Sequence, residues 1–341
     1  LRGYNPTPGA WCSISLFSAC CLAMKLYRHV SDIGTDAHHG VVVIGNFDGL
    51  HRGHQALIGE AGRLADELSA PLLVLTFEPH PRQYFKPDTQ PFRLSTFRDK
   101  ARDLQRAGVQ HLLALRFDAT LAEESAEEFI QTKLIEGLKA RHVVVGDDFH
   151  FGHQRLGNTA MLDERLSAAG IGFTAMMPVT DAADVLSSSR VRACLADGDV
   201  KQAAAILGRP VRFGGVVQKG AQRGRTIDFP TANLVLDPSL KRPAYGVYAV
   251  RAAIAEDKIE AEEPTEWWLG VANIGQRPTV DGLTELLEVH LFDAAPDLYD
   301  QYLRVELVDF IRAERKFDSF DILREQIAKD AAQARELLNP R

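Results

Sequence analysis

The sequence is poor in cysteine and has no long apolar run. Only four cysteines occur in 341 residues, and three of them lie in the first 23. We therefore expect no disulfide framework and a reducing, cytoplasmic location. No apolar run approaches the roughly 20 residues that a membrane-spanning helix requires, so no membrane partner is expected.

Basic charge and the commonest nucleotide-binding motifs are also scarce. The chain carries 39 Lys and Arg against 46 Asp and Glu, a net charge of −7, which gives no basic field for nucleic-acid binding. It has no GK[ST] motif, and no GxGxxG follows its first buried strand. Neither a P-loop kinase nor a dinucleotide dehydrogenase is therefore indicated. The length leaves room for two hydrophobic cores in one soluble enzyme.

The first 23 residues lack periodicity, and Met24 follows them as a natural start. We expect residues 1–23 to be a non-native or disordered extension from an over-extended gene model. A secretory or lipoprotein signal ending at Cys20 is the alternative, although Arg2 is the only basic residue before it.

Two patterns divide the rest of the chain. Residues 24–200 alternate short apolar runs with helical patterns, which predicts a doubly wound parallel α/β sheet. The expected strands are residues 41–44, 72–77, 111–117, 142–145 and 171–177. Beyond residue 200, strands follow one another without helices, which predicts an antiparallel β-barrel over residues 205–335 that ends in a helix at 320–338. Its expected strands are residues 211–217, 231–236, 246–254, 267–272, 286–292 and 302–310.

The most informative segment is the decapeptide GNFDGLHRGH at residues 45–54, directly after a buried strand. His51 and His54 lie one turn apart at an expected helix N-terminus, where free N–H groups and the helix dipole favour an anion. Imidazole donors there suit the negative charge that develops during nucleotidyl transfer. We predict that both histidines are catalytic. The residues predicted to bind ATP beside them are Gly45, Asn46, Phe47, Asp48 and Gly49.

Two other interpretations of the histidine pair stay open. The pair can be half of a zinc site, with His150 and His153 as the other half. It can also consist of ordinary surface histidines. Nucleotide binding is favoured because the other interpretations explain neither the preceding strand nor Gly45, Gly49 and Gly53.

Two loops after later strands add ring-binding candidates. Residues 78–81 read Glu-Pro-His-Pro and present His80, although a rigid turn with an incidental histidine explains them equally well. Residues 146–152 carry Asp148, Phe149 and Phe151, which suit a flavin or adenine ring and its hydroxyls or Mg²⁺. Alternatively, the two phenylalanines simply pack beneath the loop.

The segment SSSRVR at residues 187–192 reads as the start of a helix. Arginines in a first helical turn oppose the helix dipole unless an anion lies between them. We therefore predict that Ser188, Ser189 and Arg192 bind ATP phosphates, with Arg192 catalytic. A plain serine cap is the alternative.

In the barrel region, Pro230 precedes a strand and places Thr231 and Asn233 on one face. A hydroxyl and an amide oxygen suit Mg²⁺ and phosphate, although a solvated strand face would look the same. Glu288 lies in a half-buried strand, where an inward carboxylate would have a raised pKa and would suit a general base. A surface glutamate is the alternative.

These segments resemble bacterial bifunctional riboflavin kinase/FAD synthetases. The HxGH signature at residues 51–54 is typical of nucleotidylyltransferases, and FEPHP (77–81), VGDDFHFG (145–152) and SSSRVR (187–192) match the family in order. GRTIDFPTANL at residues 224–234 is similar to the kinase motif, followed by YGVY (245–248), NIGQRPT (273–279) and EVHL (288–291). The chain departs from the family at Asp148, Ser189 and Asp228, where Asn, Thr and Gly are usual.

The resemblance implies that the N-terminal domain transfers AMP from ATP to FMN and that the barrel phosphorylates riboflavin. It implies Mg²⁺ and phosphates at Thr231 and Asn233, and Glu288 as the base. Flavin contacts are expected at His80, Asp148, Phe149 and Phe151. The expected partners are riboflavin, FMN and ATP, bound by a monomer or weak homo-oligomer.

Two rival functions are a single-activity adenylyltransferase with a binding or dimerising barrel, and a non-catalytic flavin-binding or regulatory protein. Intact catalytic candidates in both halves argue against each of them.

Overall fold

The computed structural model describes residues 23–87, 90–218, 229–259, 263–279, 282–294 and 296–339. The predicted extension up to residue 22 and the kinase-like motif from residue 224 to Asp228 lie outside these ranges.

The N-terminal half is built on a six-stranded sheet with the order β1-β4-β3-β2-β5-β6, in which all neighbours are parallel. Its strands are Lys25–Tyr27 (β1), Val41–Ile44 (β2), Leu72–Glu78 (β3), His111–Arg116 (β4), His142–Gly146 (β5) and Gly172–Met176 (β6). The predicted parallel sheet is confirmed. The edge strand β1 was not predicted, because its three residues include two exposed ones and form no apolar run.

Successive residues of β2 point to opposite faces of the sheet. All four are apolar, so helices cover both faces. Val41 and Val43 pack with α1 (Arg52–Leu68) and α3 (Phe97–Arg106). Val42 and Ile44 pack with the opposite layer. That layer consists of α5 (Ala126–Phe129), the π-helix η2 (Ile130–Gly137) and α6 (Thr159–Ala168). The short elements of this half are η1 (Val30–Asp32), α2 (Pro81–Phe85), α4 (Ala119–Glu123) and η3 (His153–Arg155).

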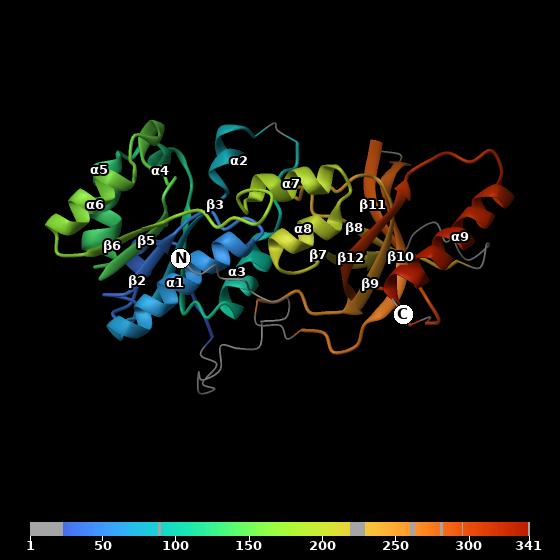
Figure 1. Cartoon of the computed structure of the whole chain (residues 1–341), viewed down its shortest axis with the longest axis horizontal. Helices are drawn as coiled ribbons and strands as arrows, with labels where there is room; N and C mark the ends of the chain where they lie inside the picture. The colour runs from blue at the N-terminus through green and yellow to red at the C-terminus, as the bar shows by residue number, and fades with distance from the viewer. Residues whose placement is uncertain are drawn as a thin grey trace.

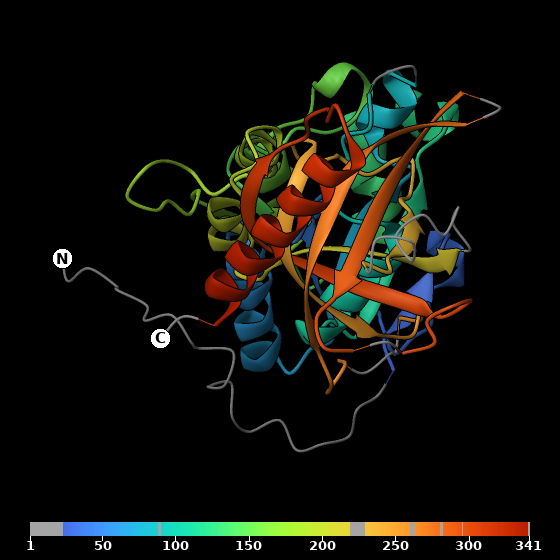
Figure 2. The same ribbon diagram turned by 90° about the vertical axis from the view of Figure 1, so that its right-hand side faces the viewer.

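The C-terminal half is a closed antiparallel barrel with the order β10-β11-β8-β7-β12-β9. Its strands are Val211–Gln218 (β7), Ala232–Val235 (β8), Gly246–Ile254 (β9), Trp268–Thr279 (β10), Gly282–Leu291 (β11) and Tyr302–Ala313 (β12). The terminal helix α9 (Phe320–Leu338) packs across the outside of the barrel (Figure 2). The predicted barrel is confirmed, although β10 and β11 form a longer hairpin than expected.

Two helices join the halves, α7 (Ser188–Ala196) and α8 (Val200–Leu207), and they lie between sheet and barrel (Figure 1). Their buried side chains belong to the same apolar core as the barrel interior. Direct contacts also cross the junction: Arg209 lies 2.9 Å from the Asp103 carboxylate. The backbone N–H of Arg93 donates to Ser239 over 3.1 Å, and that of Lys241 donates to Arg93 over 2.7 Å. The barrel side is therefore bonded directly to residues of the sheet domain.

Within the described ranges, no helix is both long enough and apolar enough to cross a membrane.

Candidate active sites

The decapeptide forms the turn between β2 and α1, at the carboxyl end of the sheet. The chain passes from β2 to β3 and β4 on one side, whereas β5 and β6 lie on the other. Such a switch point is where open α/β sheets bind ligands. Gly49 adopts a left-handed φ of 82° in this turn, and its N–H donates to the Ser95 hydroxyl over 3.2 Å. Glycine is needed here because a side chain would strain the turn.

The two histidines of the turn lie against each other. His51 is the N-cap of α1 and accepts from the His54 backbone N–H at 3.4 Å, and the two rings stack with centroids 3.7 Å apart. Burial and the charge of Arg192 lower the pKa of His51 to about 4. Burial, then His51, Lys100 and Arg192, hold the pKa of His54 well below its usual value. Both imidazoles are neutral near pH 7, so each ring carries one N–H donor.

Arg192 is tied to the same turn from α7. Its guanidinium donates to the buried Asp48 carboxylate and, over 2.7 Å, to the Phe92 carbonyl. Ser188 donates to the Asp48 carbonyl over 2.8 Å. The structure thus brings the first turn of α7 to the decapeptide, as the phosphate-binding interpretation requires.

Other residues of the SSSRVR segment have structural roles. Ser187 caps α7 by accepting from the Arg190 backbone N–H, so the serine-cap interpretation holds for this residue. Arg190 points elsewhere and pairs with Asp181 at 2.8 Å. Ser189 is exposed.

A buried cluster beneath the turn was missed in the sequence. The Lys100 ammonium, 1% exposed, lies 3.3 Å from the Asn46 carbonyl and 3.6 Å from the Glu78 carboxylate. Glu78 also accepts from Arg93 at 3.0 Å. Burial is the main cause that lowers the pKa of Lys100 to about 8. The sequence feature that could have revealed the cluster is a lysine at a core-facing position of α3, because a buried lysine is unusual unless its charge has a partner.

The predicted flavin contacts fall into two places. His80 caps α2, and its ring meets the Phe92 ring edge-on with centroids 5.1 Å apart. Phe149 and Phe151 stack on each other with centroids 5.5 Å apart. Phe151 is buried in the core, as the packing alternative expects, whereas Phe149 is half-buried and Asp148 exposed. Flavin binding at these four residues stays a prediction.

Two of the kinase candidates, Asn233 and Glu288, lie in one row across the barrel wall, and the exposed Thr231 directly precedes β8. Asn233 on β8 is directly opposite Glu288 on β11, which is opposite Asn273 on β10. Glu288 alternates with Leu287 and Val289, which are buried in the barrel interior. Its carboxylate therefore points outward, and the expectation of an inward Glu288 is wrong. The reason is the period of two along a strand, which places the apolar neighbours inside.

The zinc interpretation finds no support in this arrangement. His150 and His153 bind the backbone carbonyls of Asp148 and Ala122 at 2.8 and 3.3 Å. No group of three or more His, Cys, Asp or Glu in the described ranges is placed to hold a metal ion.

Comparison with known proteins agrees with this two-site architecture. The FAD synthetase family model matches residues 34–190, and the riboflavin kinase family model matches residues 207–338. The bifunctional riboflavin kinase/FMN adenylyltransferase of Haemophilus influenzae is 40% identical over 316 residues, covering 93% of this chain and 100% of that protein. The chain belongs to the bifunctional riboflavin kinase/FMN adenylyltransferase family. The resemblance drawn from the motifs is thereby confirmed.

Other relatives agree. The enzyme of the same name from Escherichia coli K12 is 40% identical over 314 residues, covering 92% of this chain and 97% of that protein. A crystal structure described as a macrolide-efflux protein from Streptococcus pneumoniae has a TM-score of 0.80 and 34% identity, covering 92% of this chain and 98% of that one.

Proposed function

We propose that the chain carries out its two reactions at the two sites described above, with ATP as the co-substrate of both. As a member of its family, it is a riboflavin kinase and FMN adenylyltransferase. The β2–α1 turn would transfer AMP to FMN, and the outer face of β8, β10 and β11 would phosphorylate riboflavin. The observation that carries the first assignment is the convergence of His51, His54 and Arg192 on one turn.

At the first site, an oxygen of the FMN phosphate attacks the α-phosphorus of ATP. A new P–O bond forms, the bond from the α-phosphorus to the bridging oxygen breaks, and pyrophosphate leaves with the electron pair. We assign to His51 and His54 the stabilisation of the negative charge on the α-phosphate through their N–H groups. The free N–H groups of α1 and the backbone of residues 45–49 would hold the neighbouring phosphates.

At the second site, the ribityl 5′-hydroxyl attacks the γ-phosphorus of ATP. A new P–O bond forms, the bond from the γ-phosphorus to the bridging oxygen breaks, and ADP leaves with the electron pair. We assign to Glu288 the removal of the hydroxyl proton during this attack. The outward orientation of Glu288 suits this role because a substrate cannot enter the packed barrel interior. Asn233 lies opposite Glu288, and its amide N–H₂ donates to the Thr231 carbonyl at 3.4 Å. Because the N–H₂ group makes that bond, we assign the amide oxygen of Asn233 to the ligand.

Mg²⁺ fits the second site because it prefers oxygen ligands and keeps several waters and phosphates in its shell. The Thr231 hydroxyl and the Asn233 amide oxygen supply such ligands on an exposed strand end. Bound there, the ion would neutralise phosphate charge during transfer.

A single assay tests this proposal. The purified protein is incubated with riboflavin, ATP and Mg²⁺, and the flavins are separated by chromatography. We expect FMN and then FAD. Formation of neither flavin would refute both assignments, and FMN without FAD would refute the first.

A further inference from the structure

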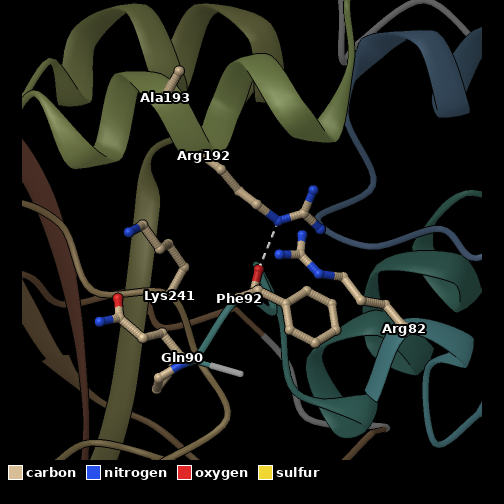
Figure 3. A pocket seen from close by; sticks show the side chains of 7 residues that line it. Arg82, Gln90, Phe92, Arg192, Ala193 and Lys241 are labelled. Carbon is tan, nitrogen blue, oxygen red and sulfur yellow. Dashed lines mark hydrogen bonds between the residues drawn. The ribbon is translucent and has the colours of Figure 1, made fainter. Parts of the chain in front are cut away.

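A cavity of about 400 Å³ opens beside the adenylyltransferase turn, and residues of both domains line it. Arg82 comes from α2 and Arg192 from α7, whereas Lys241 comes from the connection between β8 and β9. Figure 3 shows the side chains of Arg82 and Arg192 converging beside Phe92, with Lys241 across from them. Among the described residues, the lining therefore contains three cations and no carboxylate.

These cations produce a positive potential that their surroundings only partly neutralise. The guanidinium carbons of Arg82 and Arg192 lie 4.8 and 5.5 Å from the centre of the same Phe92 ring. Arg192 has Asp48 as its partner, but the ion pairs found among the described residues include none for Arg82 or Lys241. Burial and the charges of Lys100, Arg93, Arg192 and Arg82 lower the pKa of the adjacent His80 to about 3. Like charges that line one cavity favour a bound anion there.

We propose that this cavity holds the pyrophosphate group of ATP during adenylyl transfer, and that Lys241 of the kinase domain binds that group together with Arg82. This inference rests on the function proposed for the β2–α1 turn. It adds a residue of the second domain to the site of the first.

The chemistry favours pyrophosphate over the flavin. Arg192 lines the cavity and also binds Asp48 in the phosphate turn, so it connects the position of the α-phosphate with the cavity. The leaving group carries several negative charges, which match three cations better than a monoester does. Phe92 is the aromatic side chain of the lining, and two guanidinium groups already lie over its ring. A flavin ring system would have to displace them.

Backbone hydrogen bonds hold Lys241 in position. Its N–H donates to the Arg93 carbonyl, and the Arg93 N–H donates to the Ser239 carbonyl. The Arg93 side chain in turn pairs with the buried Glu78 cluster. Because these bonds to residues 239 and 241 are between backbone atoms, replacing the Lys241 side chain leaves the junction between the domains in place.

The test compares Lys241→Met, Lys241→Arg and the exposed control Lys329→Met on α9. The measurements are the KM for inorganic pyrophosphate in the reverse reaction from FAD, the KM for ATP and FMN in the forward reaction, and riboflavin phosphorylation. We expect Lys241→Met to raise the KM for pyrophosphate about tenfold, the value of one charged hydrogen bond. In Lys241→Arg, the KM for pyrophosphate should return most of the way to the wild-type value. The KM for FMN, riboflavin phosphorylation and all constants of Lys329→Met should not change.

Each contrary result is distinct. An unchanged KM for pyrophosphate in Lys241→Met, with an active wild type, would overturn the inference alone. A raised KM for FMN with an unchanged KM for pyrophosphate would assign the cavity to the flavin phosphate and overturn it too. A wild type that makes no FAD from FMN would instead refute the proposed function.

Discussion

The imidazole rings of His51 and His54 stack with their centroids 3.7 Å apart at the first turn of α1. Stacked neutral rings can direct two N–H groups to one phosphate. The double variant His51→Ala/His54→Ala should therefore lower FAD formation from FMN at least about a hundredfold. Riboflavin phosphorylation should persist, because the barrel site lies in the other domain. A folded variant that loses both activities would contradict the separation of the sites.

Asn233→Ala should have the opposite effect. It removes the amide oxygen assigned to Mg²⁺ from the position directly opposite Glu288. We expect riboflavin phosphorylation to be abolished while FMN is still adenylylated at the wild-type rate. Separate assays started from riboflavin and from FMN measure the two steps, and equal losses in both would be evidence against the assignment.

Arg192 should contribute to both stability and catalysis, unlike Arg190 two residues earlier. Arg192→Met leaves the Asp48 carboxylate, 5% exposed, without its charged partner. We expect the free energy of unfolding, measured in urea, to fall by about 3 kcal/mol. FAD formation should also fall sharply. In the control Arg190→Met, the Asp181 carboxylate is 29% exposed and keeps the N–H donors of Ala183 and Asp184, so both losses should be smaller.

The buried His51 should make stability depend on pH. Its pKa is about 4 when folded and near 6.5 otherwise, so the unfolded chain binds the proton more readily. The resulting stabilisation is complete above about pH 6.5 and disappears as the pH falls toward 4. Compared with His51→Gln, the wild type should lose about 3 kcal/mol of unfolding free energy between pH 7 and pH 4. Urea titrations of both proteins across this pH range measure the difference. Unfolding free energies that change with pH in the same way in both proteins would refute the prediction.

Gly49 and Gly59 should respond in opposite ways to alanine. At Gly49, φ is +82° and a new Cβ would lie 2.9 Å from Leu94, so Gly49→Ala should destabilise the protein by about 2 kcal/mol and slow FAD formation. Gly59 lies in the exposed part of α1 with open space around it. Gly59→Ala should stabilise the protein by about 0.5–1 kcal/mol. Thermal unfolding of the pair provides the comparison.

Local patterns predicted most of the elements because their causes are local. The run Val41–Ile44 is buried on both faces, as an interior parallel strand must be. Thr96 and Ser125 cap α3 and α5 because a hydroxyl oxygen accepts from a backbone N–H within the same turn. In β12, the alternation of Leu303, Val305 and Leu307 breaks before Phe310, and register irregularities lie there between residues 307 and 309 and between 310 and 312.

Contacts between segments that are far apart in the sequence could not be predicted from local patterns. The direction of Glu288 follows from which neighbours fill the barrel, and the Lys100 cluster follows from how α3 packs beneath the phosphate turn. Lys241 joins the cavity only because backbone hydrogen bonds attach its segment to Arg93.

Two domain types, the strands other than β1 and the residues suited to phosphate chemistry follow from the sequence alone. Periodicity, capping and motif spacing carry that information within a few residues. The tertiary structure decided that Asp48 meets Arg192, that Glu288 faces outward, and that a kinase-domain lysine borders the adenylyltransferase site. Asp48 and Arg192 alone are 144 positions apart, and such contacts arise only when sheet, connecting helices and barrel pack together.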